Sequence, residues 1–199
     1  MSQELYFIYD SHCPWSYATS SLLTDLVKAF PEINLSTMHC AYYNGSDSAG
    51  FKAVKDVEKQ SKVRFSKEYM RFVDSPKTSV ITANLMAWLT SKQEGKALAV
   101  LNALQVAHFV DGNPLGHKRD FTEVLDTFKL SVPNKVFAES LSADASSVLE
   151  DLQELQTFMG TTSFPALLLV NEDNATLLNH AAYLGDHNAL IKDVANLIG

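Results

Sequence analysis

The sequence is poor in cysteine, with Cys13 and Cys40 as its only two among 199 residues. Two cysteines are too few for the disulfide framework that stabilises small secreted domains. They are also wrongly spaced for a zinc site, and the histidines show no ligand spacing either. We therefore predict that the protein binds no metal and works in a reducing compartment.

Long apolar runs and basic clusters are missing as well. No stretch approaches the ~20 apolar residues that span a bilayer, and the chain opens without an apolar leader. These absences favour a cytoplasmic protein with no membrane partner. Lys and Arg number 16 against 23 Asp and Glu, which gives a formal charge of −7 without any cluster of cations. Because such a surface displaces few counterions from a phosphate backbone, the composition argues against nucleic-acid binding.

The chain has enough apolar content for a sizeable core, since 46% of its residues are hydrophobic and no Gly/Ser-rich or Pro-rich linker divides it. A strand over residues 5–9, a helix over 14–29 and a strand over 33–39 predict a βαβ unit. Such a crossover makes the two strands parallel, so Asp10 and Cys40 follow them at one edge of the sheet. Open α/β sheets usually place their chemistry at that edge.

The pattern is helical from residue 51 to 159, and the strand pattern then returns. Residues 166–170 and 175–179 predict a β-hairpin, with residues 172–174 as its turn. A last amphipathic helix is expected from an Asp186 cap to Ile198. The order predicts an α/β fold with a large all-helical insertion.

The most informative motif surrounds Cys13, which lies between the first strand and the first helix. Pro14 suits the first helical position, so Cys13 falls at or beside the N-cap. Free backbone amides and the positive helix end both favour a negative sulfur there. A pKa lowered by ~1.5 units would stabilise the thiolate by about 2 kcal/mol. We therefore predict an acidic, nucleophilic Cys13.

The sequence leaves open the roles of two residues expected near this thiol, His12 and Cys40. His12 is a candidate catalytic residue, because a protonated imidazole would lower the pKa of Cys13 and a neutral one would accept its proton. Cys40 is either a buried inert thiol or the partner of Cys13 in a disulfide, which requires Cα atoms within about 7 Å.

A proline directly precedes the third predicted strand, in Thr161-Thr162-Ser163-Phe164-Pro165-Ala166. Proline is awkward in a hydrogen-bonded ladder. A cis Phe164–Pro165 bond would expose the backbone N–H and C=O of Phe164 as a short edge for an extended peptide. From these residues alone, a trans proline at the start of the strand is the alternative.

These pieces together resemble the DsbA-like branch of the thioredoxin superfamily, over nearly the whole chain. The resemblance rests on three motifs, Cys13-Pro14-Trp15-Ser16-Tyr17, Gln105-Val106-Ala107-His108-Phe109 and Thr161-Thr162-Ser163-Phe164-Pro165. It implies a thioredoxin-like domain over residues 1–50 and 160–199 and an inserted helical subdomain over 51–159. It also implies that Pro165 is cis and lies beside the reactive thiol.

The chain departs from the family's Cys-x-x-Cys pattern at Ser16, which replaces the second cysteine. Without that thiol, a mixed disulfide on Cys13 waits for an outside thiol such as glutathione. The resemblance therefore implies a monothiol thiol–disulfide oxidoreductase or isomerase, with Ser16 donating a hydrogen bond to the Cys13 thiolate. It implies no tightly bound cofactor, glutathione as a cosubstrate, and a glutathionylated protein, a small disulfide or a misbridged polypeptide as substrate.

The residues expected to bind substrate flank the thiol and the proline. They are Pro14, Trp15, Ser163, Phe164 and Pro165.

Two other functions stay open. Kappa-class glutathione transferases and 2-hydroxychromene-2-carboxylate isomerases have a similar layout, but they activate glutathione with a serine where this chain has Cys13. A redox-inactive peptide-binding module is the third hypothesis. The sequence leaves the oligomeric state open, a homodimer included.

Overall fold

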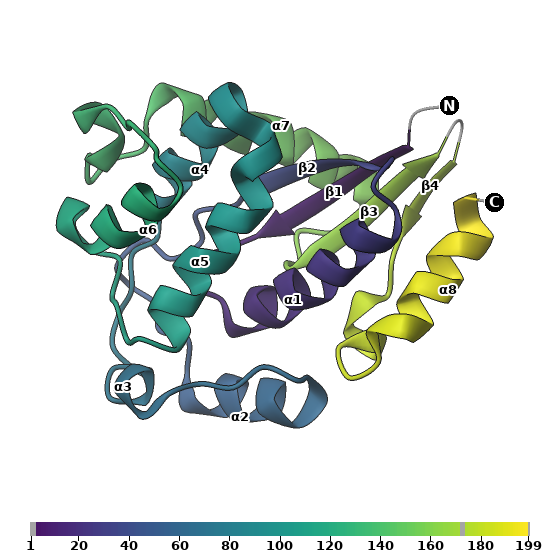
Figure 1. The fold of residues 1–199 in the computed structure, drawn as a ribbon, viewed down its shortest axis with the longest axis horizontal. Coiled ribbons are helices and arrows are strands. Elements are labelled where there is room, and N and C mark those ends of the chain that lie inside the picture. Colours follow the sequence, from purple (N-terminus) through teal and green to yellow (C-terminus); the bar gives the residue numbers. More distant parts are fainter. Residues whose placement is uncertain (1–2, 172–173, 199) are drawn as a thin grey trace.

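The computed structural model describes residues 3–171 and 174–198, and within them the strands form one four-stranded sheet in the order β2-β1-β3-β4 (Figure 1). The strands are β1 Gln3–Tyr9, β2 Asn34–His39, β3 Ala166–Asn171 and β4 Asn174–Leu177. Strand β1 runs parallel to β2 and antiparallel to β3, and β3 pairs antiparallel with β4. The predicted βαβ unit and hairpin are thus confirmed, although turn residues Glu172 and Asp173 lie outside the described residues.

The central strand β1 is apolar on both faces because both are covered. Phe7 and Tyr9 stack at 4.8 Å between ring centroids on one face, and Ile8 packs with Leu152 on the other. A strand buried on both faces has a continuous rather than an alternating apolar pattern. The register pairs Tyr9 with His39, so the two parallel strands end together, as predicted for Asp10 and Cys40.

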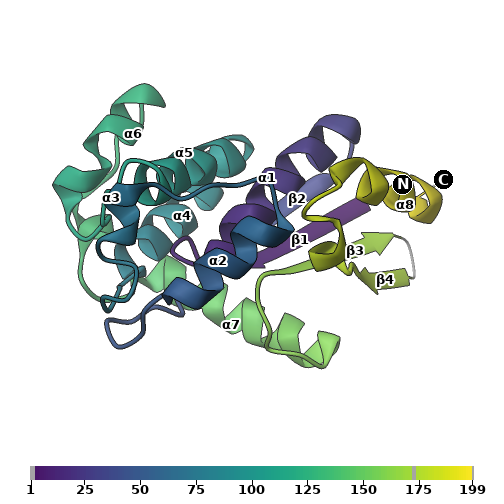
Figure 2. The ribbon, with the colours of Figure 1, turned by 90° about the horizontal axis from the view of Figure 1, so that it is seen from below.

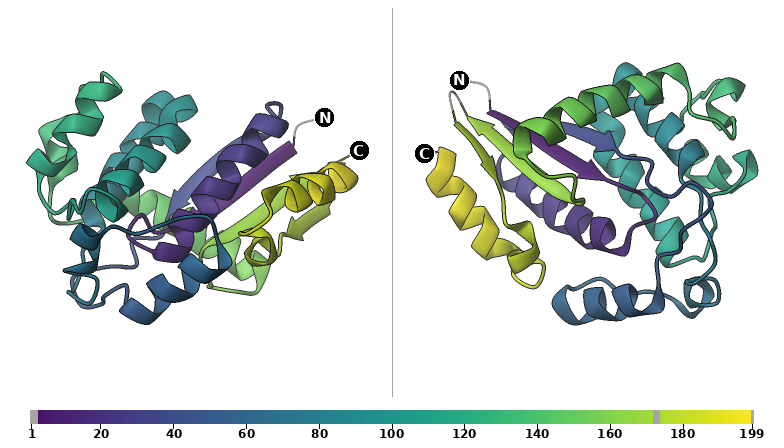
Figure 3. Two further views of the ribbon diagram at one scale, coloured as in Figure 1. Left: turned by 60° about the horizontal axis from the view of Figure 1, so that its bottom comes forward. Right: turned by 180° about the vertical axis from the view of Figure 1, so that it is seen from behind.

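Helices cover both faces of the sheet and extend well beyond it (Figure 2). The described helices are α1 Pro14–Ala29, α2 Phe51–Gln60, α3 Lys67–Met70, α4 Val80–Gln93, α5 Ala97–Phe109, α6 Thr122–Thr127, α7 Ala143–Met159 and α8 His187–Ile198. Helix α1 contacts α5 and α8 on one side of the sheet, and α7 lies along the opposite side, as the view from behind shows (Figure 3). Within the described residues, no helix combines the length and apolar character needed to cross a bilayer.

Polar and glycine cap residues set several helix ends, including the Asp186 cap predicted for the last helix. The Ser142 hydroxyl accepts a hydrogen bond from the Ala145 N–H at 3.1 Å before α7, and Gly160 ends that helix with a φ of 67°. The Asp186 carboxylate accepts one from the Ala189 N–H at 3.3 Å at the start of α8.

Within the segment whose pattern predicts helix from residue 51 to 159, residues 134–141 are an exception, because only Asn134–Phe137 forms a short 3-10 helix there. The Asn84 side chain explains the difference. Its amide donates to the carbonyl oxygens of Ala138 and Ser140 at 3.3 and 2.9 Å, which holds this segment extended. A contact across more than 50 residues thus outweighs the local helical pattern.

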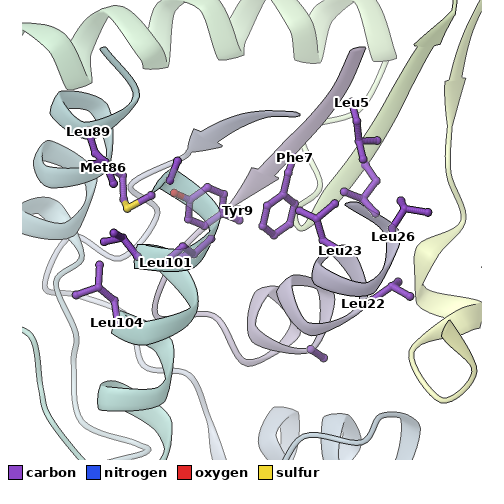
Figure 4. Close-up of a cluster of buried hydrophobic side chains, with 14 of the residues drawn as sticks. Leu5, Phe7, Tyr9, Leu22, Leu23, Leu26, Met86, Leu89, Leu101 and Leu104 are labelled. Atoms are coloured by element: carbon purple, nitrogen blue, oxygen red, sulfur yellow. The ribbon is translucent and has the colours of Figure 1, made fainter. Parts of the chain in front are cut away.

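One continuous core joins the sheet to the helical segment (Figure 4). Phe7 packs with Leu23 of α1, and the same cluster continues through Tyr9 to Met86 of α4 and Leu101 of α5. Because burying apolar surface stabilises the fold by roughly 25 cal/mol per Å², this shared core fixes the helical segment against the sheet. The division into residues 1–50 with 160–199 and an insertion over 51–159 stays a prediction.

Candidate active site

Cys13 is the N-cap residue of α1, as predicted, with extended backbone angles (φ −85°, ψ 122°) and Pro14 in the first turn. Its N–H donates to the Asp10 carbonyl at 3.1 Å, and its carbonyl accepts from the Tyr17 N–H at 3.0 Å. These two bonds form a tight turn between β1 and α1. The sulfur is thereby held at the N-terminus of the helix, where backbone amides are free.

The sulfur is also deeply buried, since Cys13 is only 6% exposed. Burial raises the pKa of the thiol to about 11. The N–H and the hydroxyl of Ser16 and the N–H of Trp15 oppose that rise, whereas the negative charge of Asp10 adds to it. The prediction of an acidic thiol is therefore wrong for this geometry. Desolvation of the thiolate, which sequence does not show, outweighs the donors at the helix end.

This raised pKa has a direct consequence for pH dependence. Only the thiolate reacts with iodoacetamide, so the alkylation rate of Cys13 should rise about tenfold per pH unit between pH 7 and 9. Mass spectrometry of timed samples of the Cys40→Ser variant measures this rate at one site. A rate that levels off below pH 8 would show that burial does not raise the pKa of Cys13, and it would support the predicted acidic thiol instead.

Ser16 is fully buried in the first turn of α1, three residues after Cys13. Its hydroxyl oxygen accepts a hydrogen bond from the Asp10 N–H at 3.3 Å. The hydroxyl proton is then free to face the Cys13 sulfur, and this contact lowers the pKa of the thiol. The geometry fits a hydroxyl that stabilises the anion whenever it forms.

His12 does not fit the role expected for it. Its ring is fully buried, with Nδ1 at 2.9 Å from the Ser11 hydroxyl and Nε2 at 3.3 Å from the Pro114 carbonyl. Burial lowers the pKa of His12 to about 4 despite the nearby Asp10 carboxylate. The ring is thus neutral at pH 7 with both nitrogens engaged, so it supplies neither a cation nor a free base to Cys13. It connects the active-site turn to the helical segment instead.

Asp10 is a site residue whose role was not predicted from the sequence. It is fully buried, and its Oδ1 accepts from the His12 N–H at 2.9 Å. Its Oδ2 accepts from the Ser79 hydroxyl at 2.7 Å and from the Tyr43 N–H at 3.3 Å. One carboxylate therefore joins the Cys13 turn, the segment after β2 and the residue before α4. A lone acid directly after an apolar strand was the only sequence signal for it.

Asp10→Asn tests this carboxylate as a positioning group. Removing its charge should lower the pKa of Cys13 and so raise the pH 7 alkylation rate several-fold. The same change should cost about 1–3 kcal/mol of stability, because the amide NH₂ replaces an oxygen that accepts hydrogen bonds. Alkylation kinetics and urea unfolding measure the two effects, with the exposed Asp151→Asn as control. A slower alkylation rate would contradict the assigned electrostatics.

The Phe164–Pro165 peptide bond is cis, as the resemblance implied. The register pairs Ile8 with Ala166, so Pro165 lies next to the last residue of β1 and hence at the edge that carries Cys13. Phe164 and Pro165 are half-buried and Ser163 is exposed. Beside them opens a cavity of about 250 Å³, lined by Thr161, Ser163, Pro165, Ala166, Leu177, Leu178, Asn179 and His180.

The other residues expected to bind substrate separate into exposed and buried ones. Trp15 is half-buried and packs against the main core, and Pro14 is buried in the first turn of α1, which leaves it little surface for a substrate. Tyr42 is 48% exposed and its ring lies 5.1 Å from that of Phe164. Tyr42 and Phe164 together form an aromatic surface next to the cis-proline.

Cys40 is a free, half-buried thiol that packs against the cluster of Ile8, Leu152 and Ala166. Burial raises its pKa, and a negative charge on Cys13 raises it further. Of the two alternatives for Cys40, the structure has the separate thiol rather than the disulfide.

Comparisons with known proteins agree with this architecture. No protein-family model and no curated protein sequence matches the chain. Among solved structures, the cytosolic disulfide reductase DsbM from Pseudomonas aeruginosa is 18% identical, covers 98% of each chain and superposes with a TM-score of 0.82. The chain has the DsbA-like thioredoxin fold. The structure of DsbM with GSH superposes at 0.79, also with 18% identity and 98% coverage of each chain.

A candidate protein disulfide isomerase from Nitrosomonas europaea has the same fold. It is 12% identical, covers 99% of this chain and 98% of its own, and superposes with a TM-score of 0.74. The thioredoxin-like α/β fold with a helical insertion, predicted from the sequence, is thereby confirmed.

Proposed function

We propose that this protein is a thiol–disulfide oxidoreductase that acts through the single thiol of Cys13. The observation that carries the proposal is the position of that thiol. Cys13 is the N-cap of α1, with the Ser16 hydroxyl and two backbone N–H groups near its sulfur, at the sheet edge that also carries the cis Pro165. These donors stabilise the thiolate, which is the form that attacks a disulfide.

The reaction proceeds in two exchanges. The Cys13 thiolate attacks one sulfur of a disulfide RS–SR′, the S–S bond breaks, and R′S⁻ leaves and takes a proton from solvent. Cys13 then carries a mixed disulfide, Cys13–SSR. Because position 16 is a serine, a second thiol such as glutathione attacks this bond, which regenerates Cys13 and forms RSSG. When R is itself glutathione, the product is glutathione disulfide and the protein substrate is released as a thiol.

Glutathione is the resolving thiol we favour. DsbM, whose fold this chain shares over nearly its full length, has a solved structure with GSH. The cavity beside Pro165 offers the exposed Ser163 and the neighbouring backbone to a peptide-like ligand. DsbM is cytosolic, which supports the proposal that this protein also works in the cytoplasm.

The transferase alternative needs a serine hydroxyl free to activate glutathione, and the serines near the thiol are engaged. The Ser11 hydroxyl lies 2.9 Å from rings of both His12 and His39. The Ser16 hydroxyl accepts from the Asp10 N–H and directs its own proton to the Cys13 sulfur. Both serines are also fully buried. The site therefore favours thiol exchange over serine-assisted conjugation.

A turnover assay tests the proposal. The protein is given a glutathionylated peptide and glutathione, and glutathione disulfide is followed by the oxidation of NADPH through glutathione reductase. We expect the parent protein to catalyse this reaction and the Cys40→Ser variant to retain the activity. Conjugation of glutathione to an electrophile by the Cys13→Ser variant would instead support the transferase. Binding of the peptide without any turnover would support a redox-inactive module.

A further inference from the structure

Tyr69 of α3 carries a buried hydroxyl, and its ring belongs to an aromatic cluster that extends to the Cys13 turn. The residue is fully buried, and its hydroxyl has no hydrogen-bond partner among the residues that the structure describes. Native proteins pair nearly all such groups, because a buried donor without an acceptor costs free energy. The Tyr69 hydroxyl is therefore free to donate to an acceptor that arrives with a substrate.

The ring of Tyr69 reaches the active-site turn through two neighbouring rings of α5, those of His108 and Phe109. It packs on His108 with 5.2 Å between the ring centroids, and His108 packs on His12 at 4.3 Å. It also packs on Phe109 at 5.0 Å, and Phe109 stacks on Tyr17 at 4.8 Å.

His12 and Tyr17 flank Cys13 in the chain, so these two rows of rings connect Tyr69 of the helical segment to the turn that carries the thiol. The hydroxyl stays protonated, because burial raises the pKa of Tyr69 and a charge on Cys13 raises it further.

A buried cation lies over the same ring. The Lys77 ammonium is 5.5 Å from the ring centroid of Tyr69 and donates to the Phe72 carbonyl at 2.7 Å. Burial lowers the pKa of Lys77 to about 8, which leaves it mostly charged at pH 7. A cation over a phenol draws electron density from the ring and strengthens the hydroxyl as a donor.

We propose that the Tyr69 hydroxyl donates a hydrogen bond to the sulfur that becomes negative when a disulfide is cleaved at Cys13. This proposal rests on the proposed exchange function and adds a catalytic residue from the helical segment. As the Cys13 thiolate attacks, the S–S bond breaks and its electron pair moves to the leaving sulfur. Tyr69 stabilises that charge while keeping its own proton, and the leaving thiolate is protonated from solvent.

Such a donor matters most for a leaving thiol of high pKa. Glutathione is an alkyl thiol and a poor leaving group, whereas the thiolate released from 5,5′-dithiobis(2-nitrobenzoate) is already stabilised by its own ring. The proposed enzyme is therefore specialised for alkyl disulfides, glutathione adducts included. Loss of the hydroxyl should slow exchange with alkyl leaving groups and leave the rate with aromatic leaving groups nearly unchanged.

The Tyr69→Phe variant tests this selectivity, because it removes only the hydroxyl. Single-turnover rates of Cys13 are measured in the Cys40→Ser background, once with glutathione disulfide and once with 5,5′-dithiobis(2-nitrobenzoate). We expect the first rate to fall about tenfold, which corresponds to about 1.4 kcal/mol, and the second to change less than twofold. The melting temperature should not fall, since the hydroxyl has no partner to lose.

Tyr9→Phe is the matched control, because its hydroxyl is also buried without a partner among the described residues. It should leave the ratio of the two rates unchanged. Equal slowing of both reagents by Tyr69→Phe, or a lower melting temperature, would show a structural role and overturn the inference. Unchanged rates would overturn it as well. If Cys13 in the Tyr69-containing parent reacts with neither reagent, the proposed function itself fails.

Discussion

Cys13→Ser should abolish disulfide exchange, lowering the turnover rate by at least about 10³-fold. A serine hydroxyl is almost never ionised near neutral pH, and its oxygen does not form the mixed disulfide on which the reaction depends. The same coupled assay measures the loss. The effect is large because no second thiol lies in the Cys13 turn, where Ser16 stands in the place of the usual cysteine.

The fold should survive this change. The Cys13 backbone makes the turn through its N–H and carbonyl, and serine keeps both bonds. Serine is also a favoured N-cap residue, so we expect a melting temperature equal to or above that of the parent. Cys40→Ser is the matched control and should keep full turnover. If turnover instead persists in Cys13→Ser and disappears in Cys40→Ser, the reactive thiol is Cys40, and the proposed role of Cys13 is wrong.

Ser16→Cys should convert the monothiol site into a dithiol one. The Ser16 hydroxyl and N–H both act on the Cys13 sulfur, so a thiol at position 16 would lie within reach of a mixed disulfide on Cys13. It would attack that bond, release glutathione and leave an internal disulfide. We expect the lifetime of the glutathione adduct to fall by about two orders of magnitude or more, because an intramolecular thiol acts at high effective concentration.

Intact mass after treatment with glutathione disulfide distinguishes the two states. The parent should carry one glutathione, and the Ser16→Cys variant should instead lose a pair of hydrogens. Ser20→Cys is the control, since Ser20 is also a buried serine of α1 but lies one turn farther from Cys13. A stable adduct on the Ser16→Cys variant would mean that the two side chains do not face each other as described.

The parts of this site that the sequence predicts are those fixed by short-range contacts. The position of Cys13 at the start of α1 follows from an apolar strand, a tight turn and Pro14, all within ten residues. Parallel pairing of β1 and β2 follows from the connection between them, so the edge shared by Asp10 and Cys40 was also predictable. The caps at Ser142 and Gly160 set the ends of α7 in the same local way.

The parts that the sequence misses depend on residues far away in the chain. The His12 ring is neutral because it is buried against Pro114, 102 residues later. The pKa of Cys13 is raised because burial in the folded protein removes the sulfur from water, which the position at the helix end does not reveal. Tyr69 lies in a four-residue helix, with no motif to mark it. Burial and long-range contacts, rather than residue type, determine the charge of His12, the pKa of Cys13 and the position of Tyr69.

The most direct test of exchange at Cys13 is a peptide map of the protein after incubation with glutathione disulfide at pH 8.5. Mass spectrometry identifies which cysteine carries glutathione and whether added glutathione removes it. The account predicts one adduct, on Cys13, that glutathione releases. An unmodified Cys13, or glutathione found on Cys40 alone, would contradict it.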